Sequence, residues 1–218
     1  WKKKQKEEKP LLYIINTSGG GNRSATFTMN VLQRLDSLTQ GTIMQKTFLI
    51  TGASGGMLGA AYFRELDRLR NSGQKIDPLN RQYVNDIAGD LLNPLFSSFV
   101  ARDLASPAQK FNVSKYQYIK DRGYAFEQKL NDNTRGLLNK QLGDLYEDEK
   151  NARMPLMIFN SVITRDGRKL IISSQRLSFL MKPYLDTSQI AGVDPDGLDY
   201  QSFFVKQDPM NLRLLTAM

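Results

Sequence analysis

The sequence contains no histidine and no cysteine in its 218 residues. Histidine is the commonest general base in enzymes and the commonest zinc ligand, so a hydrolytic serine in this chain has to work without an imidazole of its own. The absence of cysteine excludes disulfides and thiolate-bound metals. We expect no cofactor and no metal site.

Long apolar runs are also missing. No stretch approaches the roughly 18 apolar residues of a membrane-spanning helix, and no signal-peptide pattern is present. The first residue is Trp1 rather than methionine. The closing stretch, QDPMNLRLLTAM, places Asp208 as a helix N-cap and Pro209 at the first helical position. We expect this helix to continue past Met218, and the sequence to be a piece of a longer protein.

Positive charge exceeds negative charge, with a net charge of +8 and a pI of about 9.6. Residues 1–10, WKKKQKEEKP, carry five lysines against two glutamates, and we expect a flexible basic lead-in there. A basic balance suits an anionic membrane surface or nucleic acid. No basic patch interleaved with aromatic residues occurs, so nucleic acid is not expected as a partner.

Two units of strand, glycine loop and helix open the sequence. LLYIIN at 11–16 is a short apolar run that ends at a glycine cluster, and a helical pattern follows from about 22 to 38. TFLIT at 47–51 is a second apolar run, and another glycine-rich turn leads into another helix. This alternation predicts an α/β fold with a parallel-rich central sheet flanked by helices.

The remaining sequence is less regular. Residues 71–153 are mostly helical in pattern with many polar interruptions, and we expect a helical cap or insertion there. PLMIFNSVIT and KLIISS are β-rich runs joined by RDGR, whose Asp166–Gly167 pair predicts a hairpin turn. The domain that carries all these elements is expected to span residues 11–218, since the length suits a single core.

The turn after the second apolar run, GASGG, fits the pattern G-x-S-x-G with Ser54 at its centre. A serine on such a sharp strand-to-helix turn is held in a strained backbone conformation, with its hydroxyl exposed and small residues two positions away on either side. The Gly55 amide, at the start of the helix, then points at the reaction centre. The loop SGGGNRSA at 18–25 follows the neighbouring strand, so its amides complete the predicted oxyanion hole.

Two other interpretations fit parts of this pattern. TGASGGMLG is similar to the T-G-x-x-x-G-x-G loop of NAD(P)-dependent short-chain dehydrogenases, and YQYIK offers Tyr116 and Lys120 as a Y-x-x-x-K pair. That loop needs a glycine at Leu58, but the glycine comes one residue late, at Gly59, and the loop follows the second strand rather than the first. The simplest alternative is that both glycine clusters are merely tight turns. Two such clusters in succession, one of them with a centred serine, make this alternative less favoured.

SGGGNRSA followed by GASGG resembles the patatin-like phospholipases. Members of that family carry a D-G-G-G-x-R-G oxyanion loop, a G-x-S-x-G elbow and a later D-G-G or D-G-A motif whose aspartate completes a Ser-Asp dyad. The dyad uses no imidazole, in agreement with the lack of histidine. The resemblance is strong over residues 11–70 and implies a three-layer sandwich that hydrolyses acyl esters of lipids or phospholipids.

Position by position, the resemblance makes Ser54 the nucleophile. It implies that the oxyanion hole is formed by backbone amides of Gly19, Gly20, Gly21, Asn22 and Gly55. Arg23 matches the loop arginine and would hold the loop or meet a lipid phosphate, with a purely structural ion pair as the alternative. Ser18 and Ser24 replace the Asp and Gly of the family loop; Ser18 instead resembles the S-G-G-G-x-R loop of animal cytosolic calcium-dependent phospholipases, which share the dyad.

No D-G-G or D-G-A motif occurs in the sequence. The nearest substitute is DPDG, with Asp196 before Gly197, a pattern typical of a surface turn. We therefore expect the catalytic aspartate beyond Met218 and this fragment alone to be inactive, because a serine hydroxyl is a weak nucleophile until a base takes its proton. The resemblance implies a cytoplasmic domain, or a peripheral one at the cytoplasmic face of a membrane, within a longer membrane-anchored protein. A catalytically silent binding or scaffold domain of the same family is the alternative.

Overall fold

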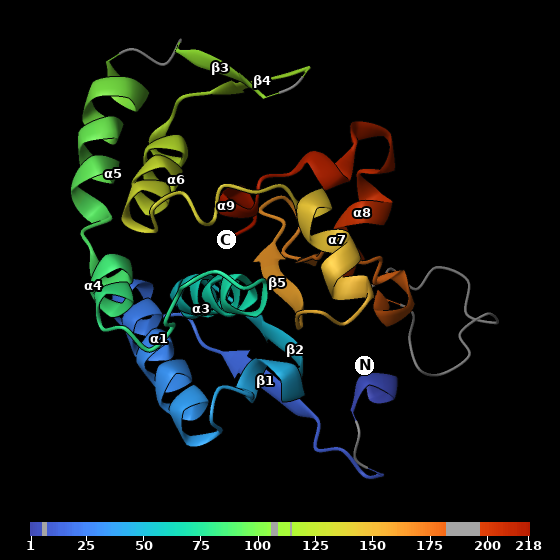
Figure 1. The fold of residues 1–218 in the computed structure, drawn as a ribbon. Coiled ribbons are helices and arrows are strands. Elements are labelled where there is room, and N and C mark those ends of the chain that lie inside the picture. Colours follow the sequence, from blue (N-terminus) through green and yellow to red (C-terminus); the bar gives the residue numbers. More distant parts are fainter. Residues whose placement is uncertain (6–7, 106–108, 114, 182–196) are drawn as a thin grey trace, which may run out of the picture.

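A computed structural model describes residues 1–5, 8–105, 109–113, 115–181 and 197–218. Its centre is a five-stranded sheet with strand order β1-β2-β5-β6-β7 (Figure 1). The strands are β1 (Tyr13–Thr17), β2 (Thr47–Gly52), β5 (Leu156–Val162), β6 (Lys169–Ile172) and β7 (Gly197–Asp199). All neighbouring pairs are parallel except β5 and β6. The predicted α/β fold with a parallel-rich sheet flanked by helices is confirmed.

The two predicted strand–loop–helix units form the first part of this sheet. β1 runs into α1 (Gly21–Leu38), and β2 runs into α3 (Gly55–Asn71), with the short helix α2 (Ile43–Lys46) before β2. β1 and β2 pair in parallel, so Thr17 lies opposite Gly52 and both strands end at the same edge of the sheet. The glycine loops that follow them are therefore neighbours in space.

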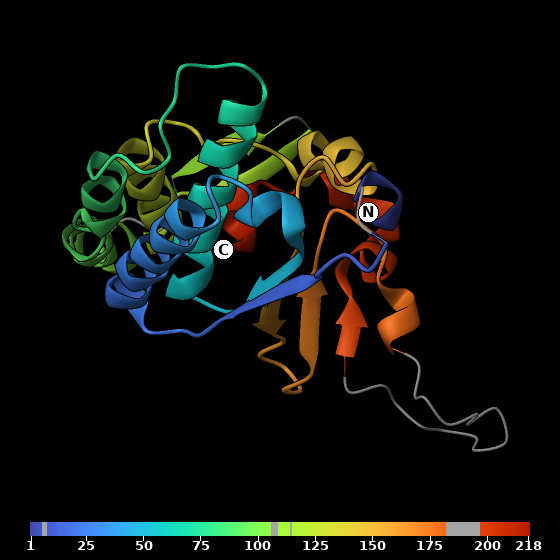
Figure 2. The same ribbon diagram turned by 60° about the horizontal axis from the view of Figure 1, so that its bottom comes forward.

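Helices α1 and α3 cover one face of the sheet (Figure 2). On that face, Ile15, Ile50 and Met157 lie in register across β1, β2 and β5 and join the hydrophobic core. The opposite face carries the alternate residues, beginning with Ile14, whose side chain is 60% exposed. Period-two alternation along the strands explains why neighbouring isoleucines have such different environments.

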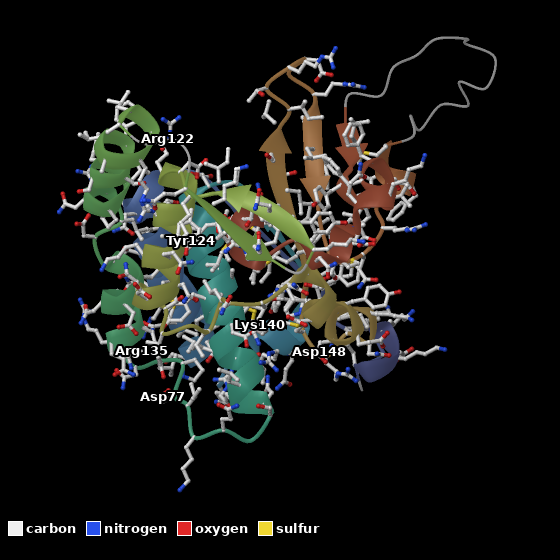
Figure 3. The ribbon with its side chains drawn as sticks, turned by 90° about the horizontal axis from the view of Figure 1, so that it is seen from above. Asp77, Arg122, Tyr124, Arg135, Lys140 and Asp148 are labelled. Atoms are coloured by element: carbon white, nitrogen blue, oxygen red, sulfur yellow. The ribbon has the colours of Figure 1, made fainter. Side chains whose placement is uncertain are left out.

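Helix α3 is buried along nearly its whole length, including the charged residues Arg64, Glu65 and Asp67. Arg64 is 2% exposed; its guanidinium forms an ion pair with Glu149 and donates to the carbonyl of Pro155 at 2.9 Å. Burial raises the pKa of the Glu149 carboxyl, and the Arg64 charge opposes that rise. Lys140, labelled in Figure 3, places its Nζ 2.9 Å from Glu65 Oε1. Paired charges let a helix with polar positions sit inside the core.

Between α3 and β5 the chain forms helices and one additional small sheet. The elements are α4 (Gln82–Ala88), α5 (Leu92–Ser98), the π-helical η2 (Phe99–Leu104), β3 (Lys110–Val113), β4 (Tyr116–Ile119), α6 (Arg122–Asn133) and α7 (Leu142–Lys150). The antiparallel pair β3–β4 was not predicted. Ile87, Leu130 and Leu138 from this region belong to the same core as α1 and α3. The region is thus packed onto the main core.

The predicted β5–β6 hairpin is confirmed. The two strands pair in antiparallel fashion from Phe159–Ile172 to Val162–Lys169. Gly167 adopts a φ of 77° in the connecting turn, a conformation that favours glycine, and the Asp166 carboxylate accepts a hydrogen bond from the Arg168 amide at 3.1 Å. The predicted Asp-Gly turn therefore lies where the sequence placed it.

The C-terminal part consists of short elements: η3 (Ser178–Met181), α8 (Tyr200–Phe203), η4 (Val205–Gln207), η5 (Pro209–Asn211) and α9 (Leu214–Ala217). The prediction of one helix starting at Asp208 is wrong. Pro209 does open a helical turn, but the turn ends after Asn211 because the next residues pair with another segment. The Leu142 amide donates to the Leu212 carbonyl at 2.9 Å and the Leu214 amide donates to the Lys140 carbonyl at 2.7 Å, so residues 212–213 are extended before α9 begins.

The N-terminal segment is in contact with the sheet. Trp1 and Phe48 of β2 are packed edge to face, with ring centroids 6.3 Å apart, and Lys2–Lys4 form the short 3-10 helix η1. Gln5 Nε2 donates to the Gln45 carbonyl at 2.9 Å. Among the described residues, no helix is both long enough and apolar enough to cross a bilayer.

Candidate active site

Ser54 lies between the end of β2 and the first residue of α3, and its side chain is exposed. Its backbone adopts φ 55° and ψ −144°. This region is nearly forbidden to residues with a Cβ and costs on the order of 1–3 kcal/mol, so the surrounding structure has to hold the serine there. Strain of this kind at an exposed serine is what a nucleophile elbow requires.

The glycines on either side of Ser54 explain how the strain is maintained. A Cβ on Gly52 would lie 2.2 Å from the Thr17 carbonyl oxygen, and a Cβ on Gly56 would lie 2.4 Å from the Ser18 carbonyl oxygen. Any side chain at these positions would collide with the backbone of the β1 segment. The G-x-S-x-G spacing is therefore a packing requirement, because the turn is pressed against the end of β1.

The predicted oxyanion loop lies directly beside Ser54. A Cβ on Gly19 would lie 3.3 Å from Ser54 Cβ and 3.9 Å from Ser54 Oγ. Gly20 and Gly21 have φ values of 149° and 59°, which turn the chain sharply into α1. Ser24 Oγ donates to the Ser18 carbonyl at 2.6 Å and ties the start of the loop to the first turn of α1.

Two helix N-termini meet at this point. A Cβ on Gly55 would lie only 1.9 Å from the Gly21 carbonyl oxygen, so the first residues of α1 and α3 are in backbone contact. The first amides of each helix lack intrahelical partners and carry partial positive charge. An oxyanion formed at Ser54 would be stabilised by both helices.

The Asn22 side chain forms hydrogen bonds with the end of α4. Its Nδ2 donates to the carbonyls of Ala88 at 2.9 Å and Gly89 at 3.1 Å, at the end of α4. The side chain thus links the oxyanion loop to the segment that leads into α5. Arg23, the next residue, is exposed and forms no ion pair with a described carboxylate, so the structural ion pair that was the alternative role for Arg23 is not present among the described residues.

Asn160 was not anticipated as a site residue. It lies near the end of β5, and its Nδ2 donates to Thr51 Oγ1 at 3.1 Å and to the Gly52 carbonyl at 3.0 Å. These bonds fix the end of β2 immediately before Ser54. The only signal in the sequence was a polar residue that interrupts the apolar run of the third strand.

No general base among the described residues forms a hydrogen bond with the serine. Ser54 Oγ forms no hydrogen bond with another described residue, and the chain has no histidine. Asp196, the predicted weak candidate, lies outside the described residues. Asp166 is occupied by the hairpin turn, where it also accepts from Arg168 Nε at 2.9 Å. Across the described ranges, no cluster of three carboxylates or other metal-binding side chains is present.

The two residues of the dehydrogenase interpretation lie on the outer hairpin. Tyr116 begins β4, and its hydroxyl donates to Asp208 at 3.1 Å. Lys120 follows β4 with its Nζ 5.8 Å from the ring centre of Tyr124. The first residue of this pair is thus in an antiparallel strand, and the partner of its hydroxyl is Asp208, far along the sequence from the glycine loops.

A cavity of about 410 Å³ lies between α5–η2 and α6, and none of the predicted site residues lines it. Ser54 instead stands at the open carboxyl edge of the sheet, between the β1 loop and the end of β5. This edge is where parallel α/β sheets usually place their binding sites. No protein-family model matches the chain, and no curated protein matches it significantly.

Proposed function

We propose that this chain carries the nucleophile and the oxyanion hole of a patatin-like lipid acyl hydrolase. The observation that carries the proposal is the backbone of Ser54, which is held at φ 55° and ψ −144° on an exposed strand-to-helix turn. A serine without a chemical role gains nothing from this conformation, whereas a nucleophile gains exposure and alignment.

The proposed reaction is acyl-ester hydrolysis with Ser54 as the nucleophile. Ser54 Oγ attacks the ester carbonyl carbon and gives its proton to a base, while the carbonyl oxygen becomes an oxyanion. The amides of Gly55 and of the loop from Gly19 to Asn22 donate to that oxyanion at the N-termini of α1 and α3. Collapse of the intermediate expels the alcohol, and water then hydrolyses the acyl enzyme.

The proposed base is an aspartate, as in the Ser-Asp dyad. None of the described carboxylates bonds to Ser54, so we place this aspartate outside residues 1–218, with Asp196 as the weaker candidate within the sequence. A catalytically silent binding or scaffold domain is the second candidate function. The absence of a partner for the serine hydroxyl among the described residues is the observation that favours it.

The proposed substrate is a lipid or phospholipid acyl ester at an anionic membrane surface. Arg23 is exposed beside the oxyanion loop, where a guanidinium suits a lipid phosphate. Residues 71–153 are proposed as the cap that receives the acyl chain. We also propose the finer architecture, a three-layer sandwich, which has helices on both faces of the sheet. Helices α1 and α3 cover one face, and the exposed Ile14 side chain lies on the other.

Fluorophosphonate labelling followed by intact-mass measurement tests the proposal. The probe is applied to this chain and to a longer version that continues past Met218, each with its Ser54→Ala variant. Ser161→Ala is the matched control, because Ser161 is an exposed serine at the end of β5, on the same edge of the sheet. We expect one label on the longer protein, lost in Ser54→Ala and retained in Ser161→Ala.

Each other outcome has a definite meaning. Labelling of the short chain that disappears with Asp196→Asn would make Asp196 the base. A longer protein that folds but takes no label at Ser54 would reject the hydrolase and leave the silent domain. A label that survives Ser54→Ala would place the reactive group elsewhere and overturn the assignment of the nucleophile.

A further inference from the structure

Helix α5 and its π-helical continuation η2 expose their largest apolar side chains. Leu92, Phe96 and Val100 are each 62% exposed, and Leu104 is 67% exposed. They recur every four residues and so form one stripe along the helix, which we call the α5 stripe. A surface helix of a globular protein normally buries such a stripe against the core.

The opposite side of α5–η2 faces the protein, and it mixes the half-buried apolar side chains of Leu95 and Phe99 with small and polar ones. Pro94, Ser97, Ser98 and Ala101 line the cavity of about 410 Å³ against α6. Ser98 is the one buried residue of α5, and its Oγ has no hydrogen-bond partner among the described residues. Helix α5 and η2 thus carry apolar side chains on both sides, and those of the α5 stripe point away from the core.

We propose that the α5 stripe inserts into the surface of an anionic lipid bilayer and brings Ser54 to its substrate. This inference rests on the proposed lipid hydrolase and adds the surface by which the domain meets the lipid. A helix with an outward apolar face and basic neighbours is the ordinary form of an interfacial membrane anchor, which lies in the plane of the headgroups.

Charge favours a lipid surface over a neutral apolar partner. Residues 92–135 contain seven Lys and Arg against four Asp and Glu, a net charge of +3. Arg122, labelled in Figure 3, lies 5.5 Å from the ring centre of Phe99 and pairs with Asp103, so these two charges offset each other. Arg102 and Lys129 line the cavity next to α5 together with Asp132, and neither cation forms an ion pair with a described carboxylate. Basic side chains beside an apolar stripe attract anionic headgroups.

Position supports the same assignment. Helix α5 forms an outer edge of the molecule, where no other described element covers it (Figure 1). Its N-terminal end is also tied to the oxyanion loop, because Asn22 bonds to Ala88 and Gly89, three residues before Leu92. A helix embedded in the headgroup layer would therefore hold the oxyanion loop next to the lipid esters.

The first test uses tryptophan fluorescence. The chain has a single tryptophan, so the variant Trp1→Phe/Phe96→Trp reports only on the α5 stripe. The probe is a suspension of vesicles of phosphatidylcholine with 30% phosphatidylglycerol, compared with pure phosphatidylcholine. We expect a blue shift of the emission maximum with the anionic vesicles. Trp1→Phe/Leu38→Trp is the control, since Leu38 is 64% exposed at the far end of α1 and should show no shift.

The second test measures vesicle binding by sedimentation. We expect Phe96→Ser/Val100→Ser to lower the vesicle partition coefficient by about tenfold or more, since two apolar side chains that would be buried in the bilayer are lost. Leu38→Ser should leave it unchanged. Ser54→Ala should bind as the unaltered chain does, so the docking surface and the proposed chemistry are tested separately.

The inference has clear contrary results. Unaltered vesicle binding in Phe96→Ser/Val100→Ser, with the fold intact by circular dichroism, would overturn it. So would an absence of vesicle binding combined with a dimer that these substitutions dissociate in analytical ultracentrifugation, because the stripe would then bind a second copy. Vesicle binding without labelling of Ser54 would support the surface while rejecting the hydrolase.

Discussion

Helices α3 and α5 differ in how far their apolar side chains are buried. In α3, Phe63 and Leu66 are completely buried, and even Arg64 is inside the core. In α5, Phe96 is 62% exposed, and Ser98 is the only buried residue. The first helix holds the strained turn of Ser54, and the second packs against the protein with the buried Ser98 and the half-buried Leu95. Close packing is concentrated where the chemistry is proposed, and exposed apolar surface where the lipid contact is proposed.

Glycine spacing explains why α3 holds its position so tightly. Gly55 and Gly59 lie one turn apart on the side of α3 that faces α1. Cβ atoms there would lie 1.9 Å from the Gly21 carbonyl oxygen and 2.2 Å from that of Ala25. The two helices thus approach to backbone contact, and the elbow at the start of α3 cannot shift without moving the oxyanion loop.

The largest expected effect is a difference in stability between variants of the two helices. Phe63→Ala should destabilise the protein by about 3–5 kcal/mol, because it empties a fully buried site. Phe96→Ala should change the free energy of unfolding by no more than about 0.5 kcal/mol, as for an exposed position. Urea unfolding followed by circular dichroism measures both.

Equal losses of stability in the two variants would show that α5 packs against something in the folded protein. The proposed lipid surface would then be an internal contact. A loss in neither variant would mean that the core around α3 relaxes into the space left by Phe63.

A smaller effect tests the contact between α1 and α3. In a helix interior, replacing glycine by alanine normally stabilises by up to about 1 kcal/mol. Gly59→Ala should instead destabilise by about 1–3 kcal/mol, because its Cβ meets the backbone of Ala25. Gly123→Ala at the start of α6 is the comparison; there the Cβ would meet Asp121 Oδ1 at 3.1 Å, the atom that caps the Tyr124 amide, so any loss comes from a helix cap and not from a contact between helices. Thermal melts of the two variants give the comparison.

If Gly59→Ala proves neutral, the two helices are not in backbone contact. The elbow would then depend on Gly52 and Gly56 alone. If both glycine variants are equally destabilised, the effect belongs to helix ends and loops in general and not to the α1–α3 contact.

Local patterns in the sequence predicted the first unit of the fold well. Apolar runs, glycine loops and the Asp166–Gly167 turn are short-range signals, and each depends on neighbours in the chain. The elbow at Ser54 was also readable, since the need for small residues on both sides is encoded within five positions. What was predicted correctly therefore depended on residues close together in the sequence.

The parts that were missed depend on distant partners. Arg64 and Glu149 read as ordinary surface charges until the fold brings them together in the core. Asn160 acquires its role only because β5 lies next to β2. The helix predicted from Asp208 ends early because its residues pair with the segment at Lys140. Single-sequence patterns carry no information about such pairings.

The smallest expected effect concerns the tie between the outer β3–β4 hairpin and the C-terminal segment. The Asp208 carboxylate lies 2.7 Å from Lys115 Nζ and accepts from the Tyr116 hydroxyl at 3.1 Å. These hydrogen bonds and the Lys115 charge lower the pKa of Asp208. Lys115→Met should therefore raise the pKa of Asp208 toward its ordinary value, and Tyr116→Phe should raise it less. Titration of the carboxyl carbon by nuclear magnetic resonance measures both shifts.

The direction of the pKa shift fixes the pH dependence of this tie. Because folding lowers the pKa of Asp208, the contact stabilises the folded state above the unfolded pKa and loses this effect as the pH falls through the folded one. Asp90 is the internal control: its pKa is lowered by the backbone amides of Leu92 and Asn93, so it should not respond to Lys115→Met. An unchanged pKa at Asp208 would mean that the hairpin is free of the C-terminal segment in solution. The β3–β4 hairpin would then, like α5, differ from the closely packed α3.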